Sequence, residues 1–277
     1  MVRKMYLSGI NKTIIFCMSL LVSVNAFGFD FKVNGLYYKI TSKEDLTVSL
    51  TAPDYHGYYE GDIVIPEYVT YNKKKYHVTS LDEKSFRGCT YLNSLTIPKS
   101  IISIEAPFID CYHIKSVTLH CKNVINNMFY EKTSLEKVTL GEGVETVGKK
   151  AFYHCSGIKS LTISNTVKSI EEQAFNHCTR IESVTIPSSV KRIGDEAFYG
   201  CINMTKLVIS EGVEKIGGYA FGYCEKIYSL TIPYSIKEWG NSPFYNCNLR
   251  IVNVPMHYTI YDLYKFGDAR IIKKDKE

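Results

Sequence analysis

The sequence repeats with a period of 23 residues, and this period constrains the fold more than any other feature of the chain. One copy follows the pattern A-F-x-x-C-x-x-I-x-x-V-x-I-P-x-S-V-x-x-I-G-x-x from Ala174 to Glu196. Eight copies are each marked by a phenylalanine: Phe86, Phe108, Phe129, Phe152, Phe175, Phe198, Phe221 and Phe244. Successive phenylalanines lie 22, 21 and then always 23 residues apart. A fixed period of this length predicts a solenoid, because each unit can bury its apolar face only against its neighbours.

The first half of each copy has the pattern of a strand. Val184-Thr185-Ile186 alternates apolar and polar residues, which is typical of a half-buried strand. One such strand in each copy predicts a parallel sheet that runs the length of the solenoid. Proline follows four of the strands and is expected to end the ladder locally, because it has no N–H to donate. These prolines are Pro98, Pro187, Pro233 and Pro255.

The second half of each copy carries apolar residues three and four positions apart, as in Val190, Ile193 and Ala197-Phe198. This spacing predicts a short strand or tight turn followed by a turn of helix that closes the coil. Gly148, Gly194 and Gly217 occupy one equivalent position, where we expect a left-handed backbone turn. The second and third copies depart from the pattern, with Pro107 before a phenylalanine and Lys132 in place of a cysteine. A local irregularity, or a shift in the stack, is expected there.

The two ends of the chain differ from the repeats. Residues 1–26 combine a basic start with a twelve-residue apolar run and small residues before position 27, which predicts a signal peptide. A membrane anchor would need ~20 apolar residues. Residues 27–60 are expected to form an N-terminal β-hairpin cap, 61–255 the solenoid, and 256–277 a C-terminal cap, because each end of a solenoid needs covering. The aromatic and apolar residues expected to cover the last coil are Tyr258, Tyr261, Leu263, Tyr264 and Phe266.

Composition and charge narrow the classes of function. The chain is 45% hydrophobic and 22% charged, which excludes disorder for the chain as a whole. The formal charge is +5, and removal of the signal peptide would leave 30 basic against 28 acidic residues. This balance argues against a nucleic-acid partner, which needs clustered Lys and Arg. No transmembrane segment is expected after the signal peptide.

Cysteines recur three residues after the repeat phenylalanine. The predicted core ladder consists of Phe86, Phe152, Phe175, Phe198, Phe221 and Phe244 with Cys89, Cys155, Cys178, Cys201, Cys224 and Cys247, and Cys111 holds the same position. Equivalent cysteines would stack ~4.8 Å apart, within disulfide range, but their side chains would point in parallel. We expect reduced thiols that fill the core and bond weakly to loop backbone. A bridge between Cys111 and Cys121 is the alternative.

Two rows of outward residues are candidate binding surfaces. Tyr130, Tyr153, Tyr199 and Tyr245 directly follow repeat phenylalanines, and amphipathic rings there could bind a partner or a sugar or could pack between coils. The outward strand residues give a hydroxyl-rich face, which is either a binding surface or a solvated sheet chosen for strand propensity. Its threonines are Thr96, Thr118, Thr139, Thr162, Thr185 and Thr231.

Enzymatic and metal sites are not indicated. The cysteines lack the close pairing of zinc ligands, and His154 and His177 recur without a third ligand. No Ser/His/Asp order, carboxylate pair or glycine-rich phosphate loop stands out, so we expect neither catalysis nor a cofactor.

The motif resembles that of a known family. The run Cys178-x-x-Ile181-x-x-Val184-x-Ile186-Pro187 through Ile193-Gly194 to Ala197-Phe198 closely resembles the BspA-like, or Treponema pallidum-type, leucine-rich repeat. The resemblance covers residues 61–255, and the cap and insertion look like those of Bacteroidetes members. It implies a leucine-rich repeat solenoid, here a right-handed β-rich coil of about eight 21–23-residue repeats. It also implies an exported or surface protein, and adhesion to host matrix proteins or other cells is described for some members.

Three functional hypotheses follow. The first is a secreted or surface-displayed protein that binds a protein partner, such as a host matrix or cell-surface protein, over several repeats. The second is a glycan-binding protein that uses the tyrosine rows. The third is a periplasmic structural scaffold without enzymatic activity.

Overall fold

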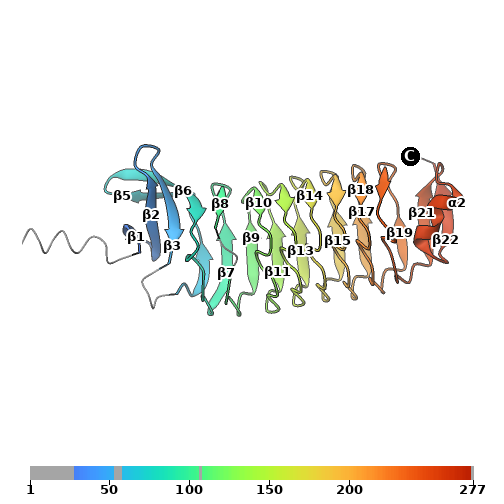
Figure 1. Cartoon of the computed structure of the whole chain (residues 1–277), viewed down its shortest axis with the longest axis horizontal. Helices are drawn as coiled ribbons and strands as arrows, with labels where there is room; N and C mark the ends of the chain where they lie inside the picture. The colour runs from blue at the N-terminus through green and yellow to red at the C-terminus, as the bar shows by residue number, and fades with distance from the viewer. Residues whose placement is uncertain (1–27, 53–57, 106–107, 276–277) are drawn as a thin grey trace, which may run out of the picture.

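A stack of similar coils forms most of the computed structural model, which describes residues 28–52, 58–105 and 108–275 (Figure 1). Each coil contributes a long strand to one face and a two-residue strand to another. The stack is elongated, with a β-sheet cap at one end and a small helical and β cap at the other (Figure 1). The predicted repeat solenoid is therefore confirmed. The predicted signal peptide lies outside the described residues.

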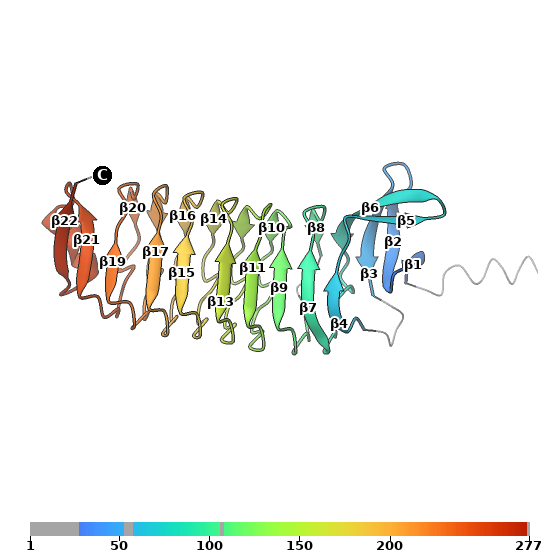
Figure 2. The same ribbon diagram turned by 180° about the vertical axis from the view of Figure 1, so that it is seen from behind.

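The long strands lie side by side in parallel along one face (Figure 2). Inward residues of these strands, such as Val138 and Leu140, are fully buried, while the residues between them face outward. This is the burial pattern that alternating residues impose on a sheet with one covered face. The long strands are β4 (Gly61–Val64), β7 (Leu92–Ile97), β9 (Ser116–Leu119), β11 (Lys137–Leu140), β13 (Ser160–Ile163), β15 (Ser183–Ile186), β17 (Lys206–Ile209), β19 (Ser229–Thr231) and β21 (Ile251–Pro255).

This long-strand face is not one continuous sheet, and its divisions agree in part with the prediction that prolines end the ladder locally. It divides into β13-β11-β9-β7-β4, then β15-β17, then β19-β21-β22. Both divisions fall where a proline follows the strand. Where no proline is present, the Ser164 N–H donates to Leu140 O of the preceding coil at 2.9 Å, and the Ser210 N–H donates to Ile186 O at 3.1 Å. Pro187 and Pro233 hold that same position and have no hydrogen to donate.

Proline weakens this ladder without separating every pair of strands. Pro98 and Pro255 occupy the equivalent position, yet β4 and β7 remain paired, as do β19 and β21. There the Ile65 N–H donates to Thr96 O, and the Ile232 N–H donates to Asn253 O. These bonds run in the opposite direction and do not involve the proline nitrogen. Pairing between neighbouring long strands is therefore interrupted beside β13 and β19, and Val208 of β17 breaks the outward threonine row as well.

The two-residue strands form a second parallel sheet without interruption from β10 to β20. Its strands are β10 (Asn123–Val124), β12 (Thr146–Val147), β14 (Ser169–Ile170), β16 (Arg192–Ile193), β18 (Lys215–Ile216) and β20 (Glu238–Trp239). Val124 pairs with Val147, so the short third repeat keeps the register of the stack. The irregularity lies one coil earlier, where β8 (Ser103–Ile104) pairs with the N-terminal cap. Residues 106–107, which include Pro107, lie outside the described residues.

Type II turns, rather than the expected turn of helix, close the coils from Phe129 to Phe221. In the coil of Phe198, the Ala197 N–H bonds to Gly194 O at 3.3 Å, and the Cys201 N–H bonds to Phe198 O at 3.4 Å. The third residue of each turn has positive φ, 53° at Glu196 and 72° at Gly200, as type II turns require. Among the described residues, helix is confined to residues 260–266.

The turn segments also bond from coil to coil. Glu196, Phe198 and Gly200 each donate an N–H to the following coil, at Gly218 O, Ala220 O and Gly222 O respectively. The same three bonds join each successive pair of coils from Phe129 to Phe244, and every one points toward the C-terminus. We call this row of bonds the turn ladder. Alternate peptide groups in each turn segment therefore lie parallel to the solenoid axis.

The expectation of left-handed glycines at positions 148, 194 and 217 was wrong. Positive φ instead falls two residues before and two residues after the repeat phenylalanine, mostly at residues other than glycine. Glycine is required at position 194 for another reason. A Cβ on Gly194 would lie 2.6 Å from Glu172 N of the preceding coil. Close approach of two backbones therefore selects glycine there.

Stacked side chains fill the interior. Phe152 and Phe175 are parallel to within 2° with ring centroids 5.1 Å apart, and this stack continues to Phe244. Each ladder cysteine from Cys155 onward donates its thiol hydrogen to the phenylalanine carbonyl of the preceding coil, as Cys155 does to Phe129 O at 2.9 Å. The thiols thus satisfy carbonyl oxygens inside an apolar core.

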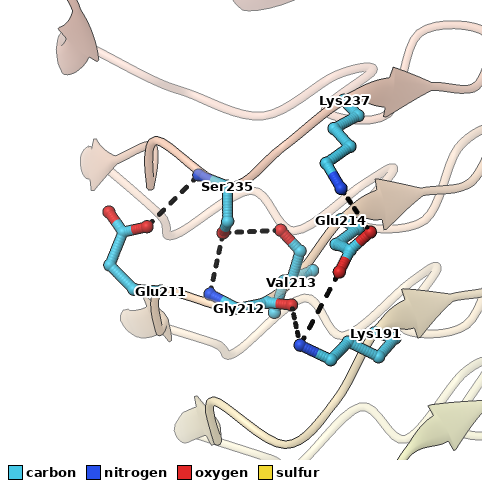
Figure 3. A network of polar contacts seen from close by, with 7 residues as sticks. All are labelled: Lys191, Glu211, Gly212, Val213, Glu214, Ser235 and Lys237. Atoms are coloured by element: carbon cyan, nitrogen blue, oxygen red, sulfur yellow. Dashed lines mark hydrogen bonds and ion pairs between the residues drawn. The ribbon is translucent and has the colours of Figure 1, made fainter.

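Polar side chains tie neighbouring coils together at the surface (Figure 3). Ser235 Oγ accepts the Gly212 N–H at 2.8 Å and donates to Val213 O at 2.7 Å. Glu214 lies between two lysines of adjacent coils, 2.8 Å from Lys237 Nζ and 3.7 Å from Lys191 Nζ (Figure 3). Both lysines hold the pKa of Glu214 below its usual value, with the Lys237 bond the larger cause.

The N-terminal cap is a mixed sheet that extends past the expected hairpin. Its strands are β1 (Phe31–Val33), β2 (Leu36–Ser42), β3 (Thr47–Thr51), β5 (Tyr68–Tyr71) and β6 (Lys74–Leu81), in the order β1-β2-β3-β6-β5. The polar insertion at 71–76 forms the β5–β6 hairpin of this sheet. Tyr59 packs on Phe86 with centroids 5.3 Å apart and so covers the first coil.

The C-terminal cap consists of α2 (Ile260–Leu263), η1 (Tyr264–Phe266) and β22 (Arg270–Lys274). The Phe266 ring lies tilted on Phe244 with centroids 5.8 Å apart, and Trp239 meets both Tyr258 and Phe266 edge-on. Tyr258 and Phe266 are buried and Leu263 is partly buried, whereas Tyr264 is 66% exposed. The side chain of Tyr261 lies outside the described residues. No helix among the described residues is long and apolar enough to cross a membrane.

Candidate functional site: an aromatic surface on the turn ladder

The predicted tyrosine row lies on the outer side of the turn ladder. Each repeat phenylalanine points into the core, so the residue that follows it points outward. Tyr130 and Tyr245 are 36% and 50% exposed, and Tyr153 and Tyr199 are half-buried. All four therefore reach the surface, as outward placement requires.

Two groups of rings make up this surface, and they differ in geometry. Tyr130 stacks face to face on Tyr153 at 5.0 Å, and His154 stacks on His177 at 4.5 Å. Further along, Tyr223 lies between Tyr199 and Tyr245 at 5.1 and 5.5 Å, with ring planes inclined by about 60°. Stacked rings cover one another's faces, whereas inclined rings leave part of each face open.

Glycines make room for the inclined rings. A Cβ on Gly222 would lie 3.0 Å from the Tyr199 ring, and a Cβ on Gly200 would lie 3.2 Å from the His177 ring. These two glycines stand where other coils carry a tyrosine or histidine. Because glycine has no side chain, the Tyr199 and His177 rings can each lie over the next coil.

A polar floor holds the rings in place. The buried Asn176 donates to Glu196 Oε2 at 3.2 Å, and Gln173 donates to the same oxygen at 2.7 Å. Asn176 in turn accepts a hydrogen bond from His177 Nδ1. Burial lowers the pKa of His177, and the neighbouring His154 lowers it further, while Glu196 acts in the opposite direction. Burial therefore favours the neutral form of the His177 imidazole.

These rings line a shallow pocket of about 320 Å³. Its lining combines five tyrosines with three polar residues: Tyr153, Tyr199, Tyr219, Tyr223 and Tyr245, with Asn176, His177 and Glu196. Tyr219 and Tyr223 are absent from the predicted row. They stand two residues before and two residues after Phe221, at the left-handed positions, and Tyr223 aligns with His154 and His177 in the 23-residue period. This alignment is the feature of the sequence that could have identified Tyr223 as part of the aromatic surface.

The threonine row is separate from this surface. Thr162, Thr185 and Thr231 are exposed, whereas Thr96, Thr118 and Thr139 are half-buried. The divisions beside β13 and β19 leave Leu161 and Ile163 only partly buried. The row does not form one flat, uniform face.

The ladder phenylalanines and cysteines all lie in the core. Phe86 and Phe244, the two end members of the predicted set, are each 4% exposed, and those between are fully buried. Of the described cysteines only Cys247 is partly exposed, and all of them are free thiols. Cys111 and Cys121 are not bridged. Burial raises the pKa of Cys89 to about 11 and that of Cys155 to about 12, so these thiols are not nucleophiles at neutral pH.

No cluster of three or more His, Cys, Asp or Glu residues that could hold a metal ion occurs in the part of the chain that the structure describes. The pair His154 and His177 stacks ring on ring and has no such third neighbour. The rings on the turn ladder are thus suited to contact a binding partner through aromatic edges, tyrosine hydroxyl groups and the His177 imidazole.

The repeat matches a family model described as the BspA type leucine rich repeat region, in six copies over residues 67–163 and 145–273. The chain belongs to this family. No curated protein matches it. Among solved structures, a leucine-rich repeat protein of T. pallidum is similar with a TM-score of 0.57 and 22% identity, over 71% of this chain and 90% of that one. A leucine-rich cell surface protein of Faecalibacterium prausnitzii has a TM-score of 0.48 and 17% identity, over 89% and 94%.

BspA-type leucine-rich repeats form a protein-interaction scaffold, and the solenoid described above is such a scaffold. The likeness to the T. pallidum protein extends only to the fold, because the identity is low.

Proposed function

We propose that this protein is exported and binds a protein partner at the cell surface through the aromatic surface of the turn ladder. The observation that carries the proposal is the continuous group of tyrosine and histidine rings between Tyr130 and Tyr245. Tyrosine is enriched at the energetic centres of protein interfaces, because it buries a large area and keeps a polar hydroxyl. Membership of the BspA-type family supports this location.

Glycan binding is the second candidate, and one observation favours it. The inclined rings of Tyr199, Tyr223 and Tyr245 leave ring faces open above the polar Asn176 and Glu196. Such a pocket can combine stacking on a sugar ring with hydrogen bonds to its hydroxyls. The stacked pairs at Tyr130 and His154 offer edges instead, and edges suit a protein surface better.

The test compares two faces of one scaffold. The mature chain from residue 27 would be applied to a panel of host matrix and cell-surface proteins and to a glycan array. A Tyr223→Ala, Tyr245→Ala double variant should bind its partner with an affinity at least about tenfold lower, which is the loss expected for one interface hot spot. The control is a Thr162→Lys, Thr185→Lys variant, which should bind normally.

Three results would change the conclusion. Loss of binding in the lysine variant alone would move the site to the threonine row. Binding to a glycan on the array, with no binding to any protein of the panel, would favour the second candidate. Resistance of the protein to protease on intact cells, with digestion after lysis, would place it in the periplasm and favour a structural scaffold.

A further inference from the structure

The turn ladder ends with unused donors at the C-terminal coil. In the coil of Phe221, the N–H groups of Tyr219, Phe221 and Tyr223 donate to Asn241 O, Pro243 O and Tyr245 O at 2.9, 2.8 and 2.7 Å. The equivalent donors of the last coil belong to Ser242, Phe244 and Asn246. Within the described residues, no protein acceptor meets any of these three N–H groups.

The last coil keeps the conformation that aligns these donors. Ser242 and Asn246 have positive φ, 43° and 54°, at the same two positions as in the preceding coils. Successive backbone N–H groups in such a turn conformation can form an anion-binding concavity. The aligned peptide groups of the five preceding ladder steps also place the positive end of their summed dipole here, as at a helix N-terminus.

The C-terminal cap does not fill the space in front of these donors. A pocket of about 570 Å³ is lined by Ser242, Phe244 and Asn246 on the coil side and by residues 264–268 of the cap. This volume is within the range of about 300–1,000 Å³ that is typical of small-molecule sites. Phe266 covers the Phe244 ring but brings no carbonyl oxygen to the ladder.

Two cationic side chains line the same pocket, against one acidic side chain. Lys265 is the notable one, because its side chain is only 7% exposed. Its Nζ donates to Asp262 O at 3.3 Å and lies 3.9 Å from the Asp262 carboxylate, with the rings of Tyr264 and Trp239 at 4.4 and 5.8 Å. Arg250 lies over Tyr228, and Asp268 is the acid. Among the described residues Asp262 O is the one hydrogen-bond acceptor of this ammonium, which leaves further N–H donors of Lys265 for an anion.

We propose that this pocket binds a small oxyanion, a carboxylate or phosphate group, between the ladder N–H groups of the last coil and the side chains of Lys265 and Arg250. The N–H row and the buried lysine are independent features of the coil and of the cap, and both select negative charge. The site is at the end of the solenoid, and Tyr245 is the one residue that lines both it and the pocket of the aromatic surface.

The single tryptophan of the chain makes the proposal measurable. Trp239 lies 5.8 Å from Lys265 Nζ, so an anion paired with this lysine should change its fluorescence. Acetate and inorganic phosphate would be titrated separately into the mature protein at constant ionic strength, which distinguishes the carboxylate and phosphate arms. Isotope-labelled phenylalanine would report in parallel on the Phe244 amide.

We expect a saturable fluorescence change and a matching shift of the Phe244 amide with one or both anions. Arg250→Gln, an exposed change that should leave the fold intact, should weaken binding about tenfold, as for the loss of one charge-assisted bond. Lys265→Gln should weaken it further, with thermal unfolding as the check on folding. Lys215→Gln, an exposed lysine on β18, is the matched control.

The proposal is wrong if neither anion gives a saturable response at Trp239 and Phe244. It is also wrong if Arg250→Gln binds as the wild type does, or if Lys215→Gln weakens binding equally, since a general charge effect would then explain the response.

Discussion

Ser235 and Ser189 occupy the same position of the repeat but have opposite surroundings, and this difference gives a sharp prediction. Ser235 Oγ bridges Gly212 N and Val213 O of the preceding coil (Figure 3). Thr166 makes the same bridge to Gly143 N and Val144 O at 3.2 and 2.9 Å. Ser189 Oγ is buried and has no partner among the described residues.

The reason lies in the preceding coil. Gly143 and Gly212 have φ of 109° and 111°, a backbone conformation that turns their N–H toward the hydroxyl. Thr166 stands at the equivalent position before Ser189 and is not among the residues with positive φ. The hydroxyl of Ser189 therefore meets no such donor.

We expect Ser235→Ala to lower the free energy of unfolding by about 1–3 kcal/mol, because it leaves Gly212 N and Val213 O without partners. Ser189→Ala should change it by about 0.5 kcal/mol or less, or stabilise the protein, because a buried unpaired hydroxyl is removed. Urea denaturation gives both values, and hydrogen exchange of the Gly212 amide shows whether the local bond was lost. Equal losses in the two variants would refute the reasoning.

Four further predictions concern the scaffold. Pro187→Ser should supply the missing N–H and increase hydrogen-exchange protection in β13 and β15; unchanged exchange there would show that proline does not cause the division. Gly194→Ala should destabilise the protein by more than the about 1 kcal/mol of a helix-propensity change, because its Cβ would meet the preceding backbone, and a urea midpoint like that of the wild type would contradict this. Thiol titration of the denatured mature chain should find eight free thiols; far fewer would mean disulfides in the core. The depressed pKa of Glu214 means that its pairing stabilises the fold above the unfolded-state pKa of about 4.3 and is lost as pH falls through the lower folded value. Lys237→Gln should therefore lose less stability than the wild type between neutral pH and about pH 3, and parallel pH profiles would count against the pairing.

The sequence by itself determined the repeating architecture. Period, strand alternation and the recurrent Phe and Cys are nearest-neighbour properties, and a solenoid is built from nearest-neighbour contacts. Residues such as Val138, Phe175 and Cys178 could therefore be assigned to the core without coordinates, and the outward position of Tyr130 follows from the inward position of Phe129.

The tertiary structure decided features that depend on which backbone groups meet across coils. Period could not distinguish the left-handed position of Glu196 from the close approach at Gly194, because both recur every 23 residues. It also could not show that Tyr223 joins Tyr199 and Tyr245, since these residues come from three different coils. The unused N–H groups at Phe244 arise only because the stack ends there, and a repeat pattern carries no information about its own end.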